Sequence, residues 1–285
     1  MYSNTTDAET TDSNGLTAFT SNGFTIGSDG ELNDPTANHV AWNWRASNTT
    51  AVTNTDGTIT STVSANTSAG FSVVTYTGNG TQPSTVGHGL GVAPKMIFVK
   101  SRSNGGTYYD WAVYNSDIGA GNAMLLNSTS GSFSKPSYWN STTATSTVFT
   151  LGSDITVNQS SATYVAYCFA PVAGYSKIGS YTGNGSTDGP FIFTGFRPRW
   201  IMIKRTDSTD DWIMMDSSRS TYNVAILTLY ANGNYAEDSN VTNRAEDFLS
   251  NGFKIRSSPS YLNASGGTYI YMASAENPLK YANAR

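Results

Sequence analysis

The stretch Tyr-Thr-Gly-Asn-Gly occurs twice in this chain, at residues 76–80 and 181–185. Glycine gives the backbone the freedom that a tight turn requires, and Asn-Gly is a typical turn pair. The two occurrences therefore predict a strand followed by a turn at each place. If they open two copies of a duplicated domain, further matches must follow at nearly the same spacing.

Further matches do follow in the same order. The segment "APKMIFVKSR" from Ala93 aligns with "RPRWIMIKRT" from Arg197, and in this alignment Lys100 and Lys204 coincide. The segment "TYVAYCFAP" from Thr163 matches "TYIYMASAE" starting at Thr268. An ordered series of this kind excludes chance and indicates two successive domains.

The N-terminal segment matches only the second half of these domains. "FTSNGFTIGS" from Phe19 aligns with "FLSNGFKIRS" from Phe248 and, more weakly, with "STVFTLGS" from Ser146. "HVAWNWRA" from His39 aligns with "YVAYCFAP" from Tyr164. The asparagines at equivalent places are Asn33, Asn158 and Asn263. Each is expected to form a hairpin turn, because Asn tolerates a left-handed backbone.

The matches divide the chain into four parts. Residues 1–46 are the C-terminal half of a truncated repeat, residues 71–171 a first full repeat, and residues 172–285 a second full repeat. A third Tyr-Thr-Gly-Asn-Gly stretch is expected before residue 1. The connector, residues 47–70, has almost no large apolar residues, which leaves two alternatives open: an exposed strand or an extended linker.

The composition favours strands over helices. Charged residues make up only 13% of the chain and aromatic residues 12%, while Ser, Thr, Asn and Gly, which disfavour helix interiors, are abundant. Alternation in "MIFVK" (96–100) and "WIMIK" (200–204) predicts strands with one face buried and the other wet or paired. We therefore expect an all-β fold of tandem antiparallel β-sandwich, jelly-roll-like repeats of about 100 residues. One short helix is expected within residues 241–253, capped by Gly252.

Few residues suggest catalysis, and no motif predicts a metal or a cofactor. The single cysteine, Cys168, lies in an apolar run and is expected to be buried and unreactive. We expect His39 to lie at a strand edge, and His88 is on a Gly-rich loop with no counterpart in the other full repeat. The acidic cluster around Asp210 and Asp211 could serve a glycosidase or hold calcium, but a solvated turn is the favoured interpretation.

The net charge of −4 is small and no Lys/Arg cluster is present, so nucleic acid is not an expected partner. No apolar run is long enough to span a membrane. Trp111 and Trp212 occupy equivalent positions and are expected to be buried. Tyr108, Tyr109 and Trp139 lie in variable polar loops. These three residues are expected to be exposed, which makes them the candidate contacts for a glycan or a partner.

Several phrases of the sequence resemble a known repeat. "STVSANTSAGFSVVTYTGNG", "VGHGLGVAPKMIFVKSRS", "DGPFIFTGFRPRWIMIKRTD" and "ENPLKYANAR" are similar to a repeat of tail-fibre and virion structural proteins predicted in marine bacteriophages. The resemblance covers nearly the whole chain and implies a structural protein of the virion exterior, assembled in the host cytoplasm, with other phage head or tail proteins as partners. It offers no catalytic residues.

Two classes of function are therefore carried forward. The first is a bacteriophage virion structural protein, an exterior fibre, appendage or capsid decoration without catalytic activity. Such a protein is expected to form a homotrimer, because trimers are usual for β assemblies of this kind. Its half-repeat could donate hairpins to a neighbouring subunit. The alternative is a carbohydrate-binding module that recognises host surface glycan. A glycan-degrading enzyme is a third hypothesis, supported only by the acidic cluster.

Overall fold

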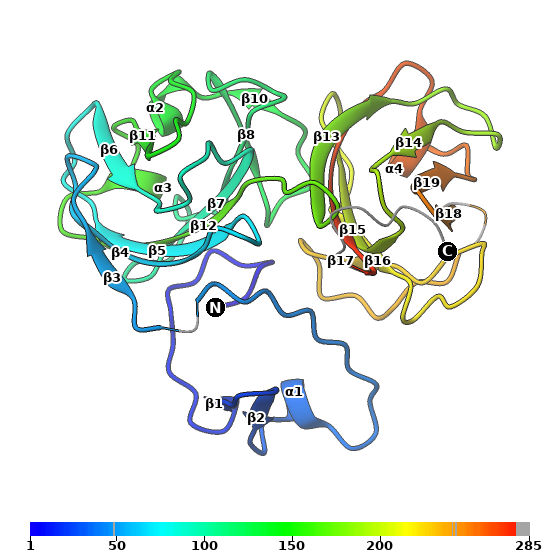
Figure 1. The fold of residues 1–285 in the computed structure, drawn as a ribbon, viewed down its shortest axis with the longest axis horizontal. Coiled ribbons are helices and arrows are strands. Elements are labelled where there is room, and N and C mark those ends of the chain that lie inside the picture. The colour runs from blue at the N-terminus through cyan, green and yellow to red at the C-terminus, as the bar shows by residue number, and fades with distance from the viewer. Residues whose placement is uncertain (48, 241, 243, 278–285) are drawn as a thin grey trace.

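A computed structural model describes residues 1–47, 49–240, 242 and 244–277 (Figure 1). The fold is nearly all β, and its strands pair antiparallel, as the composition predicted. Two β units lie side by side, and a small N-terminal module projects from them on two extended stretches of chain (Figure 1). The end of the second predicted repeat, residues 278–285, lies outside the described residues.

The first unit contains a sheet in the order β10-β9-β8-β7-β12-β5-β4-β3. Its strands are β3 (Val52–Asn54), β4 (Ser61–Asn66), β5 (Phe71–Thr77), β7 (Met96–Ser101), β8 (Ala112–Asn115), β9 (Asn122–Leu125), β10 (Phe133–Ser134) and β12 (Thr163–Phe169). A second, two-stranded sheet pairs β6 (Ser84–Gly87) with β11 (Val148–Leu151). Two helical turns, α2 (Pro136–Trp139) and α3 (Ile155–Asn158), flank β11 in the chain.

The second unit has a sheet in the order β13-β20-β15-β16-β17, which corresponds to β5-β12-β7-β8-β9. Its strands are β13 (Ser176–Thr182), β15 (Pro198–Arg205), β16 (Ile213–Asp216), β17 (Leu229–Tyr230) and β20 (Thr268–Ala275). Its smaller sheet pairs β14 (Phe191–Phe193), β19 (Gly252–Ile255) and β18 (Glu246–Leu249), and α4 (Ser260–Asn263) follows. The shared strand order supports the duplication that the sequence indicates.

The prediction of a short helix within residues 241–253 is wrong for the residues of this range that the structure describes. Residues 246–249 form β18, and Gly252 begins β19 after a two-residue turn, so this segment is a β-hairpin. Gly252 is required for close packing there, because a Cβ would lie 2.1 Å from the carbonyl oxygen of Ile192. Cross-strand pairing to β14 and β19 therefore overrides the helical preference of the local sequence.

The N-terminal module contains β1 (Leu16–Phe19), β2 (Phe24–Ile26) and α1 (Gly30–Asn33). These elements correspond in order to β18, β19 and α4. Residues 39–46, which align with β12, form no strand. The reason lies in the pairing: β12 is bonded to β5 on one side and to β7 on the other. Among the described residues the module supplies neither neighbour.

Two segments of the connector, β3 and β4, form part of the first sheet. β4 pairs with β5 along its whole length, and β3 pairs with β4. Of the two alternatives for this connector, the strand is therefore correct and the extended linker is wrong. The second unit has no counterpart of β3 and β4 among the described residues, so β13 is the edge strand of its sheet.

The Tyr-Thr-Gly-Asn-Gly stretch is clamped by the helical turn of the same unit. In the first unit the Tyr76 hydroxyl donates to the carbonyl oxygen of Val157 at 2.7 Å, and the Asn79 N–H donates to Oδ1 of Asn158 at 3.0 Å. Gly80 has a positive φ of 68°. Corresponding bonds join Tyr181 to Leu262 at 2.9 Å and Asn184 to Asn263 at 2.8 Å.

The prediction that the three equivalent asparagines form hairpin turns is wrong. Asn33, Asn158 and Asn263 are the last residues of the helical turns α1, α3 and α4. Each donates its side-chain N–H to a carbonyl six residues earlier, of Gly27 (2.7 Å), Gly152 (3.0 Å) and Ser257 (3.1 Å) respectively. The amide side chain, which both donates and accepts, explains why Asn recurs here.

Both faces of each central sheet are buried. In β7, Ile97 and Val99 face the core of their own unit, whereas Met96 and Phe98 face the second unit. Strand β15 repeats this pattern. We call the apolar layer between the units the inter-unit core; its buried members are Met96, Phe98, Trp111, Val113, Met124, Leu126, Ile178, Trp200, Met202, Trp212, Ala231, Ile270 and Met272. The sequence predicted that the second face of these strands is either wet or paired. The structure shows that this face is paired with the other unit.

The asparagine clamp leads to a prediction about stability. Asn263→Ala removes the partners of the Asn184 N–H and of the Ser186 carbonyl. We expect the free energy of unfolding of the second unit to fall by about 1–3 kcal/mol, because buried backbone groups lose hydrogen bonds. Denaturant unfolding followed by tyrosine and tryptophan fluorescence measures the change.

The matched control is Asn33→Ala. Asn33 is exposed, and its side chain bonds only the nearby Gly27 carbonyl among the described residues, so we expect a change below about 1 kcal/mol. Equal effects of the two substitutions would contradict the clamp.

Candidate functional site

The three predicted binding residues are not brought together as a site. Tyr108 is exposed over 68% of its surface, as expected. Tyr109 is half-buried, and its hydroxyl donates to Oε1 of Gln159 at 2.7 Å. The expectation that Trp139 is exposed is wrong, because only 1% of its surface is accessible. It packs edge-on against Tyr114 with ring centroids 5.7 Å apart.

The burial of Trp139 has a local cause. Pro136 begins the helical turn α2, where its fixed φ is favourable, and this turn directs Tyr138 and Trp139 into the core of the first unit. A single helical turn inside a polar loop was not visible in the sequence pattern. With its indole buried, Trp139 has no ring face to offer to a sugar.

The cysteine and the histidine considered in the sequence are both enclosed. Burial raises the pKa of the Cys168 thiol to about 12, which keeps it protonated and unreactive. The His88 ring is buried, and its two nitrogens contact the Thr145 carbonyl at 3.1 Å and the Leu90 N–H at 3.2 Å. Burial also lowers the pKa of His88. Neither side chain reaches a surface where a substrate could meet it.

The acidic cluster holds the ends of strands together. Asp211 accepts a hydrogen bond from Asn232 at 2.8 Å, and Asn232 in turn accepts the backbone N–H of Trp212 at 2.6 Å. The first unit repeats this chain of contacts with Asp110, Asn127 and Trp111. Asp210 is nearly buried. The equivalent aspartates therefore act as structural clamps, which is more than the solvated turn expected.

The inter-unit core is closed by a lysine and a tryptophan from the second unit. Trp212 Nε1 donates to the Leu125 carbonyl oxygen at 2.9 Å, and Lys204 Nζ donates to the Thr129 carbonyl oxygen at 2.7 Å. Both acceptors belong to the first unit. Burial lowers the pKa of Lys204 to about 8. We call this pair of contacts the inter-unit clamp.

The first unit makes the same contacts with the N-terminal segment. Trp111 Nε1 donates to the Tyr2 carbonyl oxygen at 2.9 Å, and Lys100 Nζ donates to the Thr6 carbonyl oxygen at 3.2 Å. Tyr2 and Thr6 have the same spacing as Leu125 and Thr129. The aligned lysines inside two apolar strands were the sequence signal for this clamp, but the sequence did not reveal which residues they bind.

An exposed hollow of about 430 Å³ lies on the second unit beside Tyr235. The ring of Tyr235, 66% exposed, stands edge-on to that of Tyr230 with centroids 5.8 Å apart. Asp211, Asp238 and Arg244 also line the hollow. An aromatic ring beside charged hydrogen-bonding groups is suited to a polar ring-shaped ligand. This hollow had no sequence signal, because most of its lining, residues 235–238 and Arg244, lies in a segment without a counterpart in the internal alignment.

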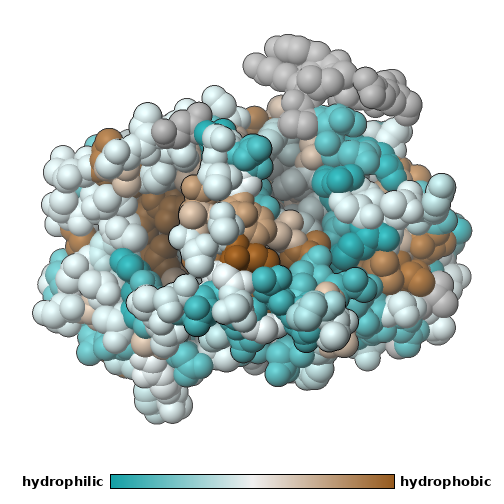
Figure 2. All heavy atoms as spheres, turned by 90° about the horizontal axis from the view of Figure 1, so that it is seen from below, coloured by the Kyte–Doolittle hydropathy of each residue, from teal (hydrophilic) through white to brown (hydrophobic). Residues whose placement is uncertain are grey.

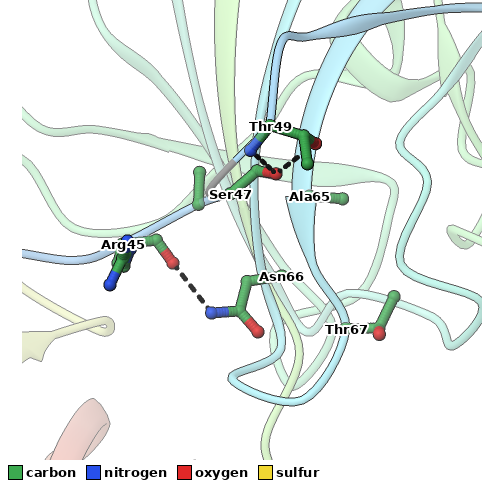
Figure 3. A pocket seen from close by; sticks show the side chains of 7 residues that line it. Arg45, Ser47, Thr49, Ala65, Asn66 and Thr67 are labelled. Atoms are coloured by element: carbon green, nitrogen blue, oxygen red, sulfur yellow. Dashed lines mark hydrogen bonds between the residues drawn. The ribbon is translucent and has the colours of Figure 1, made fainter.

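A second hollow, of about 400 Å³, is polar and lies where residues 45–47 and Thr49 pass the end of β4 (Figure 3). Asn66 donates to the Arg45 carbonyl oxygen at 3.1 Å, and the hydroxyls of Ser47 and Thr49 are 3.0 Å apart. The hollow offers hydroxyl, amide and guanidinium groups. Its described lining contains no carboxylate, thiol or imidazole, so it lacks a general base.

One buried acid has no evident structural partner. Glu246 is fully buried in β18, and neither carboxylate oxygen has a hydrogen-bond partner among the described residues. Burial raises its pKa well above the usual value, and the nearby Asp247 acts in the same direction. Burial therefore favours the neutral acid over the carboxylate at this position.

Over the described residues, no group of three or more His, Cys, Asp or Glu side chains is placed to hold a metal ion. A search of the same residues for a helix with the length and apolar character needed to cross a membrane finds none.

The comparisons with known proteins give a family but no activity. Residues 1–278 match a family described as a domain of unknown function, DUF7483. The chain belongs to this family. Neither a curated protein nor a solved structure matches it.

The buried Glu246 leads to a prediction about pH. Because its pKa is raised in the folded state, the folded chain keeps a proton that the unfolded chain releases near pH 4.3. Stability therefore falls as the pH rises above that value towards the folded-state pKa. We expect Glu246→Gln to have the melting temperature of the parent near pH 4 and a higher one near pH 7.

Thermal unfolding at the two pH values tests this expectation. Glu237→Gln is the control, since the Glu237 carboxylate is partly exposed beside Arg219 and is not desolvated in this way. If Glu246→Gln raises the melting temperature by the same amount at both pH values, proton binding by Glu246 is not the cause.

Proposed function

We propose that this chain is a structural protein of a bacteriophage virion, placed on the exterior as a fibre, an appendage or a capsid decoration, without catalytic activity. The phrases shared with virion repeat proteins suggest the phage context. The observation that carries the structural role is the inter-unit clamp, whose Trp and Lys contacts recur between the first unit and the N-terminal segment, with acceptor carbonyls four residues apart in both cases.

A clamp made twice suits serial assembly. Each unit presents a Trp and a Lys to the segment that precedes it in the chain, at one spacing and with the same acceptor atoms. Units that dock through one reused interface form an array whose length grows by addition of units. Such an array suits a fibre or a surface layer. The proposed partners are further copies of the chain, as a homotrimer, and other phage head or tail proteins.

The enclosed reactive groups also favour a structural role. The thiol of Cys168 and the ring of His88 are buried, and Asp110 and Asp211 hold strand ends. A catalytic site needs a nucleophile or base that reaches its substrate. The small net charge of −4, spread over the chain, likewise gives no basis for proposing nucleic acid as a partner.

The proposal predicts that the chain is a component of the mature particle. Particles of the phage that encodes it, purified on a density gradient, are expected to contain this chain by mass spectrometry. Antibodies raised against the recombinant chain should label their outer surface in electron micrographs. The same antibodies pre-absorbed with the chain are the control. Absence of the chain from washed particles would refute the proposal.

A second candidate function is glycan binding, which the hollow at Tyr235 favours. A sugar ring stacks on an exposed aromatic face while carboxylates and guanidinium groups bond its hydroxyls, and Tyr235, Asp211 and Arg244 provide both. Tyr108 is a separate exposed ring in the first unit. This function is compatible with a virion surface, where host glycans are met.

Glycan arrays test this second candidate. If the hollow binds sugar, Tyr235→Ala should lower binding of a responsive glycan by tenfold or more, because the sugar loses the aromatic face on which it would stack. Tyr222→Ala is the matched control: Tyr222 is 86% exposed in the same unit but does not line the hollow. Tyr108→Ala tests the first unit. An array without binding by the parent chain would end the glycan hypothesis.

A further inference from the structure

A hollow of about 430 Å³ lies where the chain passes from the first unit into β13 (Figure 1). Three residues of the linker between the units form one side of it, residues 176–178 of β13 a second side, and residues 193–195 at the end of β14 a third. Lys95, from the first unit, completes the lining. We call this space the linker hollow.

In the first unit, strand β4 fills the equivalent place. Gly89 corresponds to Gly195, since each follows the last residue of β6 or β14 by two positions and has a positive φ, of 69° and 86° respectively. A Cβ at Gly89 would lie 2.8 Å from Cγ1 of Val63 in β4. The second unit has no counterpart of β3 and β4 among the described residues, so the same space is open beside β13.

Two side chains show that the linker hollow is not simply a vacant strand position. Phe193 stands at the position of Gly87, where a Cβ would lie 1.7 Å from Oδ1 of Asn54 in β3. Lys177 is exposed at the position of Ser72, which is fully buried in the first unit. The larger side chains take up the room that a hairpin like β3–β4 needs. A different kind of occupant is therefore required.

The lining offers an aromatic face and a positive charge. Phe193 is 58% exposed, and its ring lies beside Gly195, 3.8 Å from the place of a Cβ there. Lys95 is already bonded to Asp117 at 3.1 Å, whereas Lys177 has no ion-pair partner among the described residues. None of the described residues that line the hollow carries a carboxylate. The linker hollow is therefore suited to an anion.

The polar surroundings limit which anion fits. Ser176 Oγ accepts the Val172 N–H at 3.0 Å, which leaves its own proton free to donate to a ligand. On the face of the molecule that Figure 2 shows, apolar residues reach the surface in separate patches among polar ones. A ligand that matches an exposed ring in such surroundings is polar overall and has one apolar face, as a pyranose ring does.

We propose that the linker hollow binds an acidic saccharide, a sugar ring that carries a carboxylate. The apolar face of the ring stacks on Phe193, the carboxylate pairs with Lys177, and Ser176 donates to a sugar oxygen. An acidic peptide would use the cation but leave the aromatic face unused. The site is separate from the hollow at Tyr235, and it does not require a place on a virion.

Three acidic sugars and their neutral counterparts test the site. The probes are the methyl glycosides of glucuronic, galacturonic and N-acetylneuraminic acid, each beside the analogue whose carboxyl group is reduced to an alcohol. Binding to the full chain is measured by ligand-observed NMR at low salt, where exposed charges are least screened. We expect at least one acid to bind with a millimolar or lower dissociation constant, and its neutral analogue to bind at least about tenfold more weakly.

Two results with these probes would overturn the proposal. One is the absence of binding by all three acids at millimolar concentration. The other is equal binding of an acid and its neutral analogue, which would show that the lysine is not used.

Variants of two lining residues locate the binding. Phe193→Ala and Lys177→Ala should each weaken binding at least about tenfold, whereas Lys177→Arg keeps the charge and should restore most of it. Phe191→Ala is the matched control, because Phe191 is 45% exposed in the same strand but does not line the hollow. Thermal unfolding of each variant checks that the fold is retained. Equal losses from Phe191→Ala and Phe193→Ala would refute the assignment to this hollow.

Two further measurements separate this site from the alternatives. Tyr235→Ala should leave binding of the acid unchanged, and a loss would place the sugar in the other hollow and overturn the proposal. A short glutamate peptide should not displace the acid. Displacement would show that the linker hollow recognises charge alone, which contradicts a sugar site. Detection of the chain in purified particles tests only the virion role, so the two proposals can fail independently.

Discussion

Burial of the central strands on both faces is the constraint on which the structure depends. Strands β7 and β15 carry apolar residues at consecutive positions, so a single two-layer unit would leave one apolar face in water. The free energy gained by burying apolar surface, roughly 25 cal/mol per Å², therefore drives the units together. The inter-unit core is the result, and it makes the two units one body rather than two linked domains.

Directional contacts then fix how the units meet. Apolar layers alone tolerate sliding, whereas Lys204 and Trp212 must reach particular carbonyl oxygens of the first unit. A buried ammonium is costly without such acceptors, so any other register would leave it unsatisfied. The same pair in the first unit binds the N-terminal segment. The same pair of side chains therefore makes both of these junctions in the described residues, and the proposed serial structural role rests on this repetition.

The sequence predicted the periodic features well and the local exceptions poorly. Strand positions, the all-β class and the burial of Trp111, Trp212 and Cys168 could be read from alternation and from internal alignment. The burial of Trp139 could not be read, since a one-turn helix begun by Pro136 has no periodic signal. The expected helix around Gly252 failed because cross-strand partners more than fifty residues away decided its conformation. The hollow at Tyr235 had no sequence signal, and the composition of the connector left a strand and an extended linker both open.

The sequence by itself determined which segments are equivalent, because equivalent segments must satisfy the same local turn and strand requirements. The repeated Tyr-Thr-Gly-Asn-Gly stretch identified the strand and turn that open each unit. Only the tertiary structure decided which helical turn each stretch binds, and that Asn158 and Asn263 hold it. Among the described residues no such contacts are made to Asn33, and Phe24 and Leu32 of the same module are 39% and 43% exposed. The local sequence is enough to form a strand and a turn that can bind a clamp asparagine. Whether such an asparagine lies within reach depends on how the whole chain folds.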